Sequence, residues 1–352
     1  AAAAFIGAFF TALSTLRNVA QTSPAIQRAG AFLASQPPGR RYGALTVGGQ
    51  AFSLLLSYGS LQLVGTLAVA NANAEPDAEV RRHRIRRMLL AIQRAFVSSL
   101  PWSPLSFAVV VSTSVIPDTS WLQIVLPGLV TAFILAGVGW ALDTAIKPKL
   151  TARPLRAAPQ GAWAAMLPLV GLLVVFIIGV GVLNQLSDVR IVGIISVLVP
   201  AIALVWLGIQ NLADAPVAGT ARRIRTYVLE ELPGYRGELV LLMMAGYIGT
   251  VGSQLLGPLL VNAGLDPSAV TAWVILVSFV WILPVAGQIG MNPILAVTLL
   301  APLIPGAASL GVRPEALVVA VTSGWALTGA SSPFTATTLL IGSFGGVSAQ
   351  HV

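Results

Sequence analysis

Hydroxyl and amide side chains that precede prolines are the groups in this sequence best suited to chemistry. Three such pairs, Ser103-Pro104, Asn292-Pro293 and Ser332-Pro333, lie within long apolar runs. Proline removes a helical hydrogen bond and clashes with the preceding turn, so each pair predicts a break in a helix. Free carbonyl, hydroxyl and amide oxygens at a break suit a hard cation. The helix N-terminus that follows a break attracts an anion.

We therefore expect a solute-binding site in which these breaks and two Gly/Ser-rich segments come together. The candidate solute-binding residues are Ser57, Ser60, Arg94, Ser99, Ser103, Thr250, Ser253, Asn292, Ser331, Ser332 and Thr335. Three of them, Ser103, Asn292 and Ser331, are also candidate ligands for a coupling Na⁺. No catalytic set and no other cofactor is indicated, since the chain has no Cys and its two histidines, His83 and His351, lie in a loop and at the end of the sequence.

Arg94 is the one basic residue inside the apolar run 88–97. A charge at the bilayer centre costs at least about 3 kcal/mol, so the guanidinium must pair, face water or reach the interface. One reading is attraction of an anionic solute near the 101–104 break. The other is snorkelling to the cytoplasmic surface, because Arg94 follows Arg87 by only seven residues.

The composition predicts an all-α polytopic membrane protein. The chain is 56% hydrophobic and 9% charged, and its mean hydropathy is +0.86. A soluble domain is about one quarter charged, and apolar runs of about 20 residues are long enough to cross a bilayer as helices. The net charge of +8 comes from basic residues in short loops, which indicates positive-inside topology rather than nucleic-acid binding. We expect membrane lipid around the chain and a multi-pass location in a bacterial inner membrane.

Short matches at an offset of about 190 residues indicate an internal duplication. The motif at 139–142 recurs at 324–327, the segment from Ser103 matches that from Asn292, and 59–65 matches 252–257. We place the first repeat at 1–150 and the second at 151–352. In a membrane protein, two such repeats are typical of a transporter whose site lies between them.

Hydropathy divides the repeats into elements. The first comprises an arm, a re-entrant hairpin candidate at 43–70, a broken helix at 88–117 and a span at 121–146. The second comprises spans at 161–186 and 191–209, an arm at 211–236, a hairpin candidate at 237–263, a broken helix at 269–305 and a broken span at 312–344. If both Gly-rich segments are hairpins, four spans separate them and the repeats are parallel. If both cross fully as tilted helices, five spans separate them and the repeats are inverted. The sequence leaves both open.

This order of arm, hairpin and broken helix, given twice, resembles the ion transporter superfamily, which includes divalent-anion/sodium symporters, citrate and gluconate carriers and membrane subunits of tripartite carboxylate transporters. The run 331–338, Ser-Ser-Pro-Phe-Thr-Ala-Thr-Thr, is similar to the substrate-loop signatures of those families. The Ser-Asn-Thr signature of the divalent-anion symporters is not present. The resemblance implies inverted repeats and an elevator motion against a static scaffold.

The sequence therefore predicts a non-enzymatic secondary transporter for a small anionic solute, an organic acid being the expected class, coupled to a cation. A homodimer is compatible with it. The alternatives are an ion channel or passive permease, a membrane-embedded enzyme, and a non-transporting subunit of a larger complex. The enzyme lacks support because paired acids, membrane histidines and cysteines are missing from the apolar runs.

Overall fold

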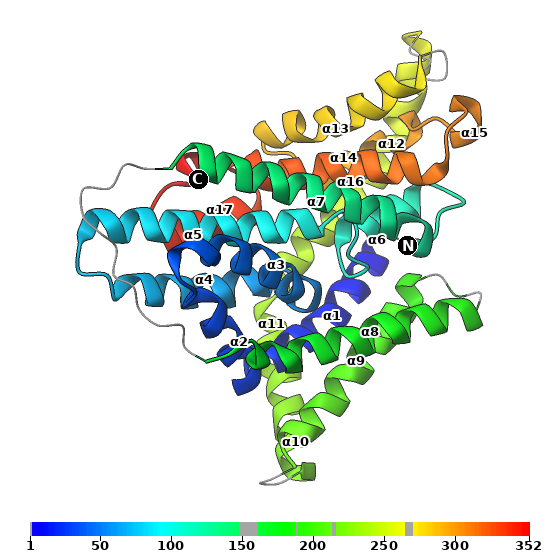
Figure 1. Ribbon diagram of the computed structural model, residues 1–352. Coiled ribbons are helices and arrows are strands. Elements are labelled where there is room, and N and C mark those ends of the chain that lie inside the picture. The colour runs from blue at the N-terminus through cyan, green and yellow to red at the C-terminus, as the bar shows by residue number, and fades with distance from the viewer. Residues whose placement is uncertain (1, 148–160, 188, 190, 213–215, 265–269) are drawn as a thin grey trace.

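The computed structural model describes the chain except residues 1, 148–160, 188, 190, 213–215 and 265–269. The described residues form helices and connections, with no strand among them (Figure 1). The helices are α1 (Ala2–Gln21), α2 (Pro24–Ala34), α3 (Pro38–Leu56), α4 (Tyr58–Asn73), α5 (Ala78–Ser99), α6 (Phe107–Val115), α7 (Trp121–Ala145), α8 (Leu167–Leu186, after the short η1, Trp163–Met166), α9 (Ile191–Gln210), α10 (Pro216–Thr226), α11 (Leu232–Gly234, after η2, Tyr227–Glu231), α12 (Arg236–Asn262), α13 (Ala272–Gln288), α14 (Pro293–Leu300), α15 (Ala307–Leu310), α16 (Pro314–Ser331) and α17 (Ala336–Gly345), with short turns at Ala301–Leu303 and Ala349–His351.

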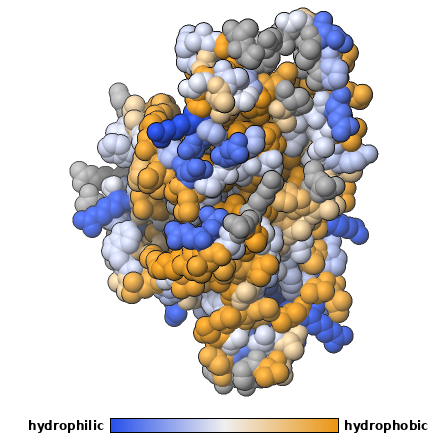
Figure 2. Space-filling model, turned by 90° about the vertical axis from the view of Figure 1, so that its right-hand side faces the viewer, coloured by the Kyte–Doolittle hydropathy of each residue, from blue (hydrophilic) through white to orange (hydrophobic). Residues whose placement is uncertain are grey.

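The predicted fold class is confirmed: the chain is an all-α polytopic membrane protein. Among the described residues, five helical segments are long and apolar enough to cross a bilayer: Ala3–Gln21, Trp121–Ala145, Trp163–Leu186, Ile191–Gln210 and Arg236–Leu256. Large apolar side chains on them face outward; Phe133 of α7, for example, is 73% exposed. Broad hydrophobic areas cover the face shown in Figure 2. Such a surface requires lipid around it.

The first hairpin is made by α3 and α4, which meet at Ser57. This residue has a positive φ of 49° and is the one residue between the two helices. Gln50 of α3 bonds Ser98 of α5, whereas α4 runs back along α5, with Tyr58 beside Phe96 and Gly65 beside Leu89. Because α3 runs parallel to α5 and α4 runs antiparallel to it, the chain turns back on itself at Ser57, as expected for a re-entrant hairpin.

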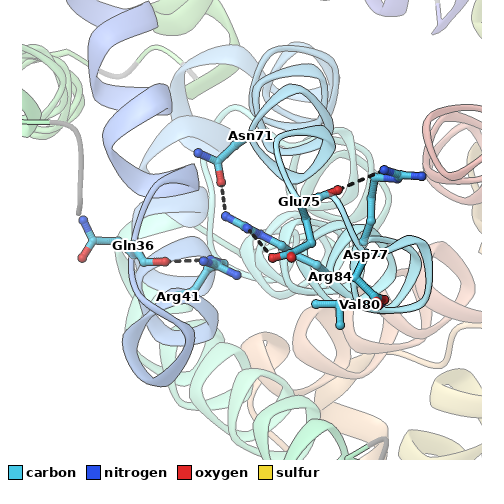
Figure 3. A network of polar contacts seen from close by, with 8 residues as sticks. Gln36, Arg41, Asn71, Glu75, Asp77, Val80 and Arg84 are labelled. Carbon is cyan, nitrogen blue, oxygen red and sulfur yellow. Dashed lines mark hydrogen bonds and ion pairs between the residues drawn. The ribbon is translucent and has the colours of Figure 1, made fainter. Parts of the chain in front are cut away.

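Polar contacts hold the base of this hairpin together (Figure 3). Arg84 of α5 bonds Asn71 near the end of α4 and pairs with Glu75 at 3.7 Å. Arg41, at the start of α3, donates to the Gln36 carbonyl at 2.7 Å. Burial and the nearby charges of Arg84 and Arg87 lower the pKa of Arg41 to about 10. The charge of Glu75 acts in the opposite direction and raises this pKa. Arg41 therefore stays cationic at neutral pH.

A second hairpin is made by α13 and α14. Gly324 of α16 lies against Phe279 and Val280 of α13, and Gly287 at the end of α13 lies against Thr328 and Ser332. Helices α13 and α16 therefore run parallel, and α14 leads the chain back toward the start of α16 (Figure 1). Gly290, with a φ of 85°, reverses the chain at the tip.

Each hairpin is followed by a discontinuous helix. In the first unit α5 breaks at residues 100–106 and continues as α6, and in the second α16 breaks at 332–335 and continues as α17. Gly329, at the end of α16, lies against Val97 of α5, whereas Gly345, at the end of α17, lies against Leu89. The two discontinuous helices are therefore antiparallel. The units α3–α6 and α13–α17 have opposite directions, which is the arrangement of inverted repeats.

Two of the expected elements are wrong. The hairpin expected at 237–263 is absent, because α12 is one continuous helix of 27 residues. The broken helix expected at 269–305 is instead the second hairpin. The Gly- and Ser-rich composition that suggested a hairpin in α12 also suits close helix packing: Gly249 lies against Thr298 of α14.

The expected equivalences between repeats also change. Ser103 corresponds in the fold to Ser332, not to Asn292, and Asn292 lies at a hairpin tip. The proposed boundary between residues 150 and 151 lies outside the described residues.

Candidate functional site

The two helix breaks share one sequence pattern and one hydrogen-bond pattern. Ser103-Pro104-Leu105-Ser106 lies between α5 and α6, and Ser332-Pro333-Phe334-Thr335 lies between α16 and α17. In each, the serine N–H still bonds the carbonyl four residues earlier, at 2.9 Å, so the preceding helix ends there. Its Oγ accepts the N–H two residues later, at 3.2 Å. Proline then prevents the helix from continuing.

The last residue of each pattern starts the next helix. Ser106 Oγ accepts the Val109 N–H at 3.1 Å, and Thr335 Oγ1 accepts the Thr338 N–H at 3.5 Å. A side-chain oxygen at this position satisfies an N–H that the helix leaves free. Both helices, α6 with nine residues and α17 with ten, thus begin at a break inside the protein.

The breaks meet where the two discontinuous helices cross. Gln93 of α5, only 3% exposed, donates from Nε2 to the Gly329 carbonyl of α16 at 3.4 Å. A Cβ on Gly329 would be 3.1 Å from Val97 and 3.8 Å from Leu100. We call this region the crossing: Gln93 and residues 97–106 of the first unit, and residues 328–338 of the second.

Each hairpin tip approaches the break of its own unit. At the second tip, Ser332 Oγ donates to the Gly287 carbonyl at 2.7 Å, and a Cβ on Gly290 would lie 3.8 Å from the Phe334 ring. At the first tip, Ser57 and Leu105 line one small cavity of about 20 Å³. The two tips therefore flank the crossing from opposite sides.

The electrostatics of the crossing come mainly from the backbone. The N-termini of α6 and α17 face it with partial positive charge, and the C-termini of α5 and α16 contribute carbonyl oxygens. The side chains here are neutral: Ser99 and Ser103 from the first unit, and Ser332, Thr335 and Thr338 from the second. Among the described residues no three His, Cys, Asp or Glu side chains gather to bind a metal.

Several expected site residues lie at the crossing or at the tips. Ser99, Ser103, Ser331, Ser332 and Thr335 belong to the two breaks, and Ser57 and Asn292 to the two tips. Ser60 is close behind the first tip, where its Oγ donates to the Ser57 carbonyl at 2.7 Å and lies 3.1 Å from Ser53 Oγ. Asn292 caps α14 by accepting the Ile294 N–H at 2.8 Å.

Thr250, Ser253 and Arg94 lie elsewhere. The hydroxyls of Thr250 and Ser253 both donate to carbonyls of their own helix, α12, at 2.8 Å. Arg94 Nη1 donates to the Gly139 carbonyl of α7 at 2.7 Å and to the Tyr42 hydroxyl at 3.0 Å. These contacts join Arg94 to α7 and α3, away from the break.

Sequence reasoning missed Gln93, Ser106 and Arg17. The recurrence of Ser-Pro-x-Ser/Thr in the two halves could have revealed Ser106 as the partner of Thr335. Arg17 of α1 lines the cavity at the first hairpin tip with Ser57 and Glu238. Its Nη2 donates to Gln62 Oε1 at 3.3 Å, its guanidinium lies 5.2 Å from the Tyr235 ring centre, and its Nε has no partner. No local pattern in α1 marks Arg17, because the hairpin reaches it only in the fold.

This fold of a polytopic membrane protein, with two hairpins and two crossing discontinuous helices, is similar to that of a solved membrane transporter. One such structure is the crystal structure of the Alcanivorax borkumensis YdaH transporter, described as having an unusual topology. It matches with a TM-score of 0.53 over 95% of this chain and 76% of that chain, at 18% identity. At this identity the likeness shows a shared fold. No family model and no curated protein matches the chain.

Proposed function

We propose that this protein is a secondary active transporter that moves a small anionic solute, such as an organic acid, across a bacterial inner membrane. The crossing carries the proposal: two oppositely directed helices are interrupted at the same Ser-Pro-x-Ser/Thr pattern and meet there. Interrupted backbone at membrane depth is tolerated where it is buried in protein or lines a water-filled cavity, and two such interruptions that meet support a binding site. We also propose that the protein is a member of the ion transporter superfamily.

The preference for an anion follows from the helix N-termini. Those of α6 and α17 face the crossing and are capped by neutral hydroxyls. Since no carboxylate cap offsets their partial positive charge, an anionic group can bind there. Arg17 adds a positive charge at the first hairpin tip, in the cavity that Glu238 also lines. In this proposal Arg17 takes the electrostatic role that the sequence suggested for Arg94.

The coupling cation is proposed to be Na⁺, with oxygen ligands only. The carbonyl ends of α5 and α16 supply backbone oxygens, and Ser103, Asn292 and Ser331 are the side chains proposed to complete its coordination. A hard cation bound first would offset the partial negative charge of these carbonyl ends, so that the positive helix N-termini can attract the anionic solute.

The two hairpins suit alternating access. The base of the first lies at the N-terminal end of α5, and the base of the second lies at the N-terminal end of α16. Because α5 and α16 are antiparallel, the hairpins reach the crossing from opposite sides. Moving the two units together against the remaining helices, as an elevator, would expose the site to one side at a time.

Uptake into proteoliposomes tests the proposal. A panel of labelled organic acids should include one whose uptake saturates with concentration and requires an inward Na⁺ gradient. Uptake that rises linearly with concentration and ignores the gradient would indicate the alternative, a channel or passive permease. Absence of uptake for every acid tested, from a protein that remains folded, would overturn the transporter assignment.

A further inference from the structure

The arginines in the first turns of α5 divide onto two faces. Arg84 pairs with Glu75, and Arg87 pairs with Asp143 of α7. Arg82 and Arg86, one helical turn apart, instead face a cavity of about 600 Å³. Their position on the cavity side separates Arg82 and Arg86 from the ion pairs that Arg84 and Arg87 form.

This cavity has a basic end and an apolar end. Arg81, Arg82, His83 and Arg86 line the first, and the second is lined by Leu89, Leu90, Ile341 and Val347. It contains no acidic residue among its lining side chains. Along α5 the change from charged to apolar residues takes place within one turn, between Arg86 and Leu89, so the cavity offers a charged and an apolar surface side by side.

Two like charges one turn apart on a helix repel each other. An anion between Arg82 and Arg86 would remove this repulsion, and a neighbouring apolar wall would bind a hydrocarbon chain. An anionic glycerophospholipid has both groups in one molecule, whereas free phosphate has only the first.

We propose that the cavity between α5 and α17 binds one anionic phospholipid, with its phosphate at Arg82 and Arg86 and an acyl chain along Leu90 and Ile341. The lipid would join the first unit, which contains α5, to the second, which contains α17. It would therefore stabilise the crossing without taking part in it. This inference is independent of the proposed transport function.

Thermal unfolding of the purified protein, followed by tryptophan fluorescence, tests the lipid site. Short-chain phosphatidylglycerol should raise Tm in a saturable way, while phosphatidylcholine of the same chain length and inorganic phosphate should not. In Arg82→Gln/Arg86→Gln the half-saturating concentration should rise about 30-fold, since each arginine near an anionic headgroup contributes on the order of 1 kcal/mol, and 1.4 kcal/mol is tenfold. Arg40→Gln, an exposed arginine of α3, is the matched control and should bind as the unmodified protein does.

Val347→Gln probes the apolar wall and should weaken phosphatidylglycerol binding as well. All of these side chains are at least partly exposed, so the variants should fold. An equal Tm rise with phosphatidylcholine, a full rise with phosphate alone, or unchanged binding in the double variant would overturn the proposal.

Discussion

Ser103 and Ser332 hold the same position in two helices that run in opposite directions. Each ends its helix with an N–H bond of 2.9 Å to the carbonyl four residues earlier, and each accepts from the N–H two residues later at 3.2 Å. Ser332 also bonds the second hairpin through Gly287. The two breaks are therefore equivalent parts of the crossing.

Ser332→Ala should reduce solute uptake strongly and lower Tm. The change removes the 2.7 Å bond to the Gly287 carbonyl and leaves a buried acceptor unsatisfied, which costs about 1–3 kcal/mol. Uptake into proteoliposomes and thermal unfolding measure the two effects. Ser343→Ala is the control, because Ser343 is exposed and bonds a carbonyl of its own helix. Equal behaviour of the two variants would argue against a role for Ser332 at the hairpin tip.

Removing the caps of α6 and α17 should weaken solute binding more than it weakens the fold. Ser106→Ala and Thr335→Ala each lose an N-cap, worth about 1 kcal/mol of stability, and also disturb the N-terminus proposed to face the anion. We expect the KM for uptake to rise in both. Thr113→Ala in α6, whose hydroxyl bonds carbonyls of its own helix, provides the comparison. The anion-binding role fails if all three variants keep the same KM.

Gly324→Ala should destabilise the protein by about 1–3 kcal/mol, because a Cβ there overpacks a close helix contact. That Cβ would lie 2.5 Å from the Phe279 carbonyl oxygen and 3.1 Å from Leu283. Gly171→Ala in α8 meets no atom within 4 Å and should leave Tm unchanged or slightly higher. Thermal unfolding in detergent compares the two, and an unchanged Tm for Gly324→Ala would contradict the packing of α13 on α16.

Substitution of Arg17 should change mainly the KM for uptake, whereas substitution of Arg94 should change mainly the Tm. Arg17→Gln should raise the KM for the anion several-fold, with a smaller change in Tm, since Arg17 lines the cavity at the hairpin tip. Arg94→Gln should lower Tm, because it loses bonds to the Gly139 carbonyl and Tyr42, and charged hydrogen bonds contribute about 1.5–3 kcal/mol. Measuring KM and Tm for both variants separates the roles. A raised KM for Arg94→Gln alone would restore the assignment suggested by the sequence.

The helix breaks and most spans were predictable because their causes are local. Pro104 and Pro333 interrupt apolar runs, and the uninterrupted run at 121–146 becomes α7. The same local signals cannot distinguish a hairpin from a long helix. Gly and Ser are frequent both at the Ser57 tip and along α12, yet α12 is continuous. The choice depends on which helix packs on those small residues, and the sequence alone does not show that.

Composition and hydropathy by themselves determined that this chain is a helical membrane protein with interrupted helices, because the cost of unpaired backbone in lipid acts on each segment separately. Only the tertiary structure decided that the repeats are inverted and that Ser103 corresponds to Ser332. It also placed Arg17 at a hairpin tip and Arg94 against α7. These features depend on the directions in which helices pack. Short apolar sequence matches between the repeats are compatible with several such packings.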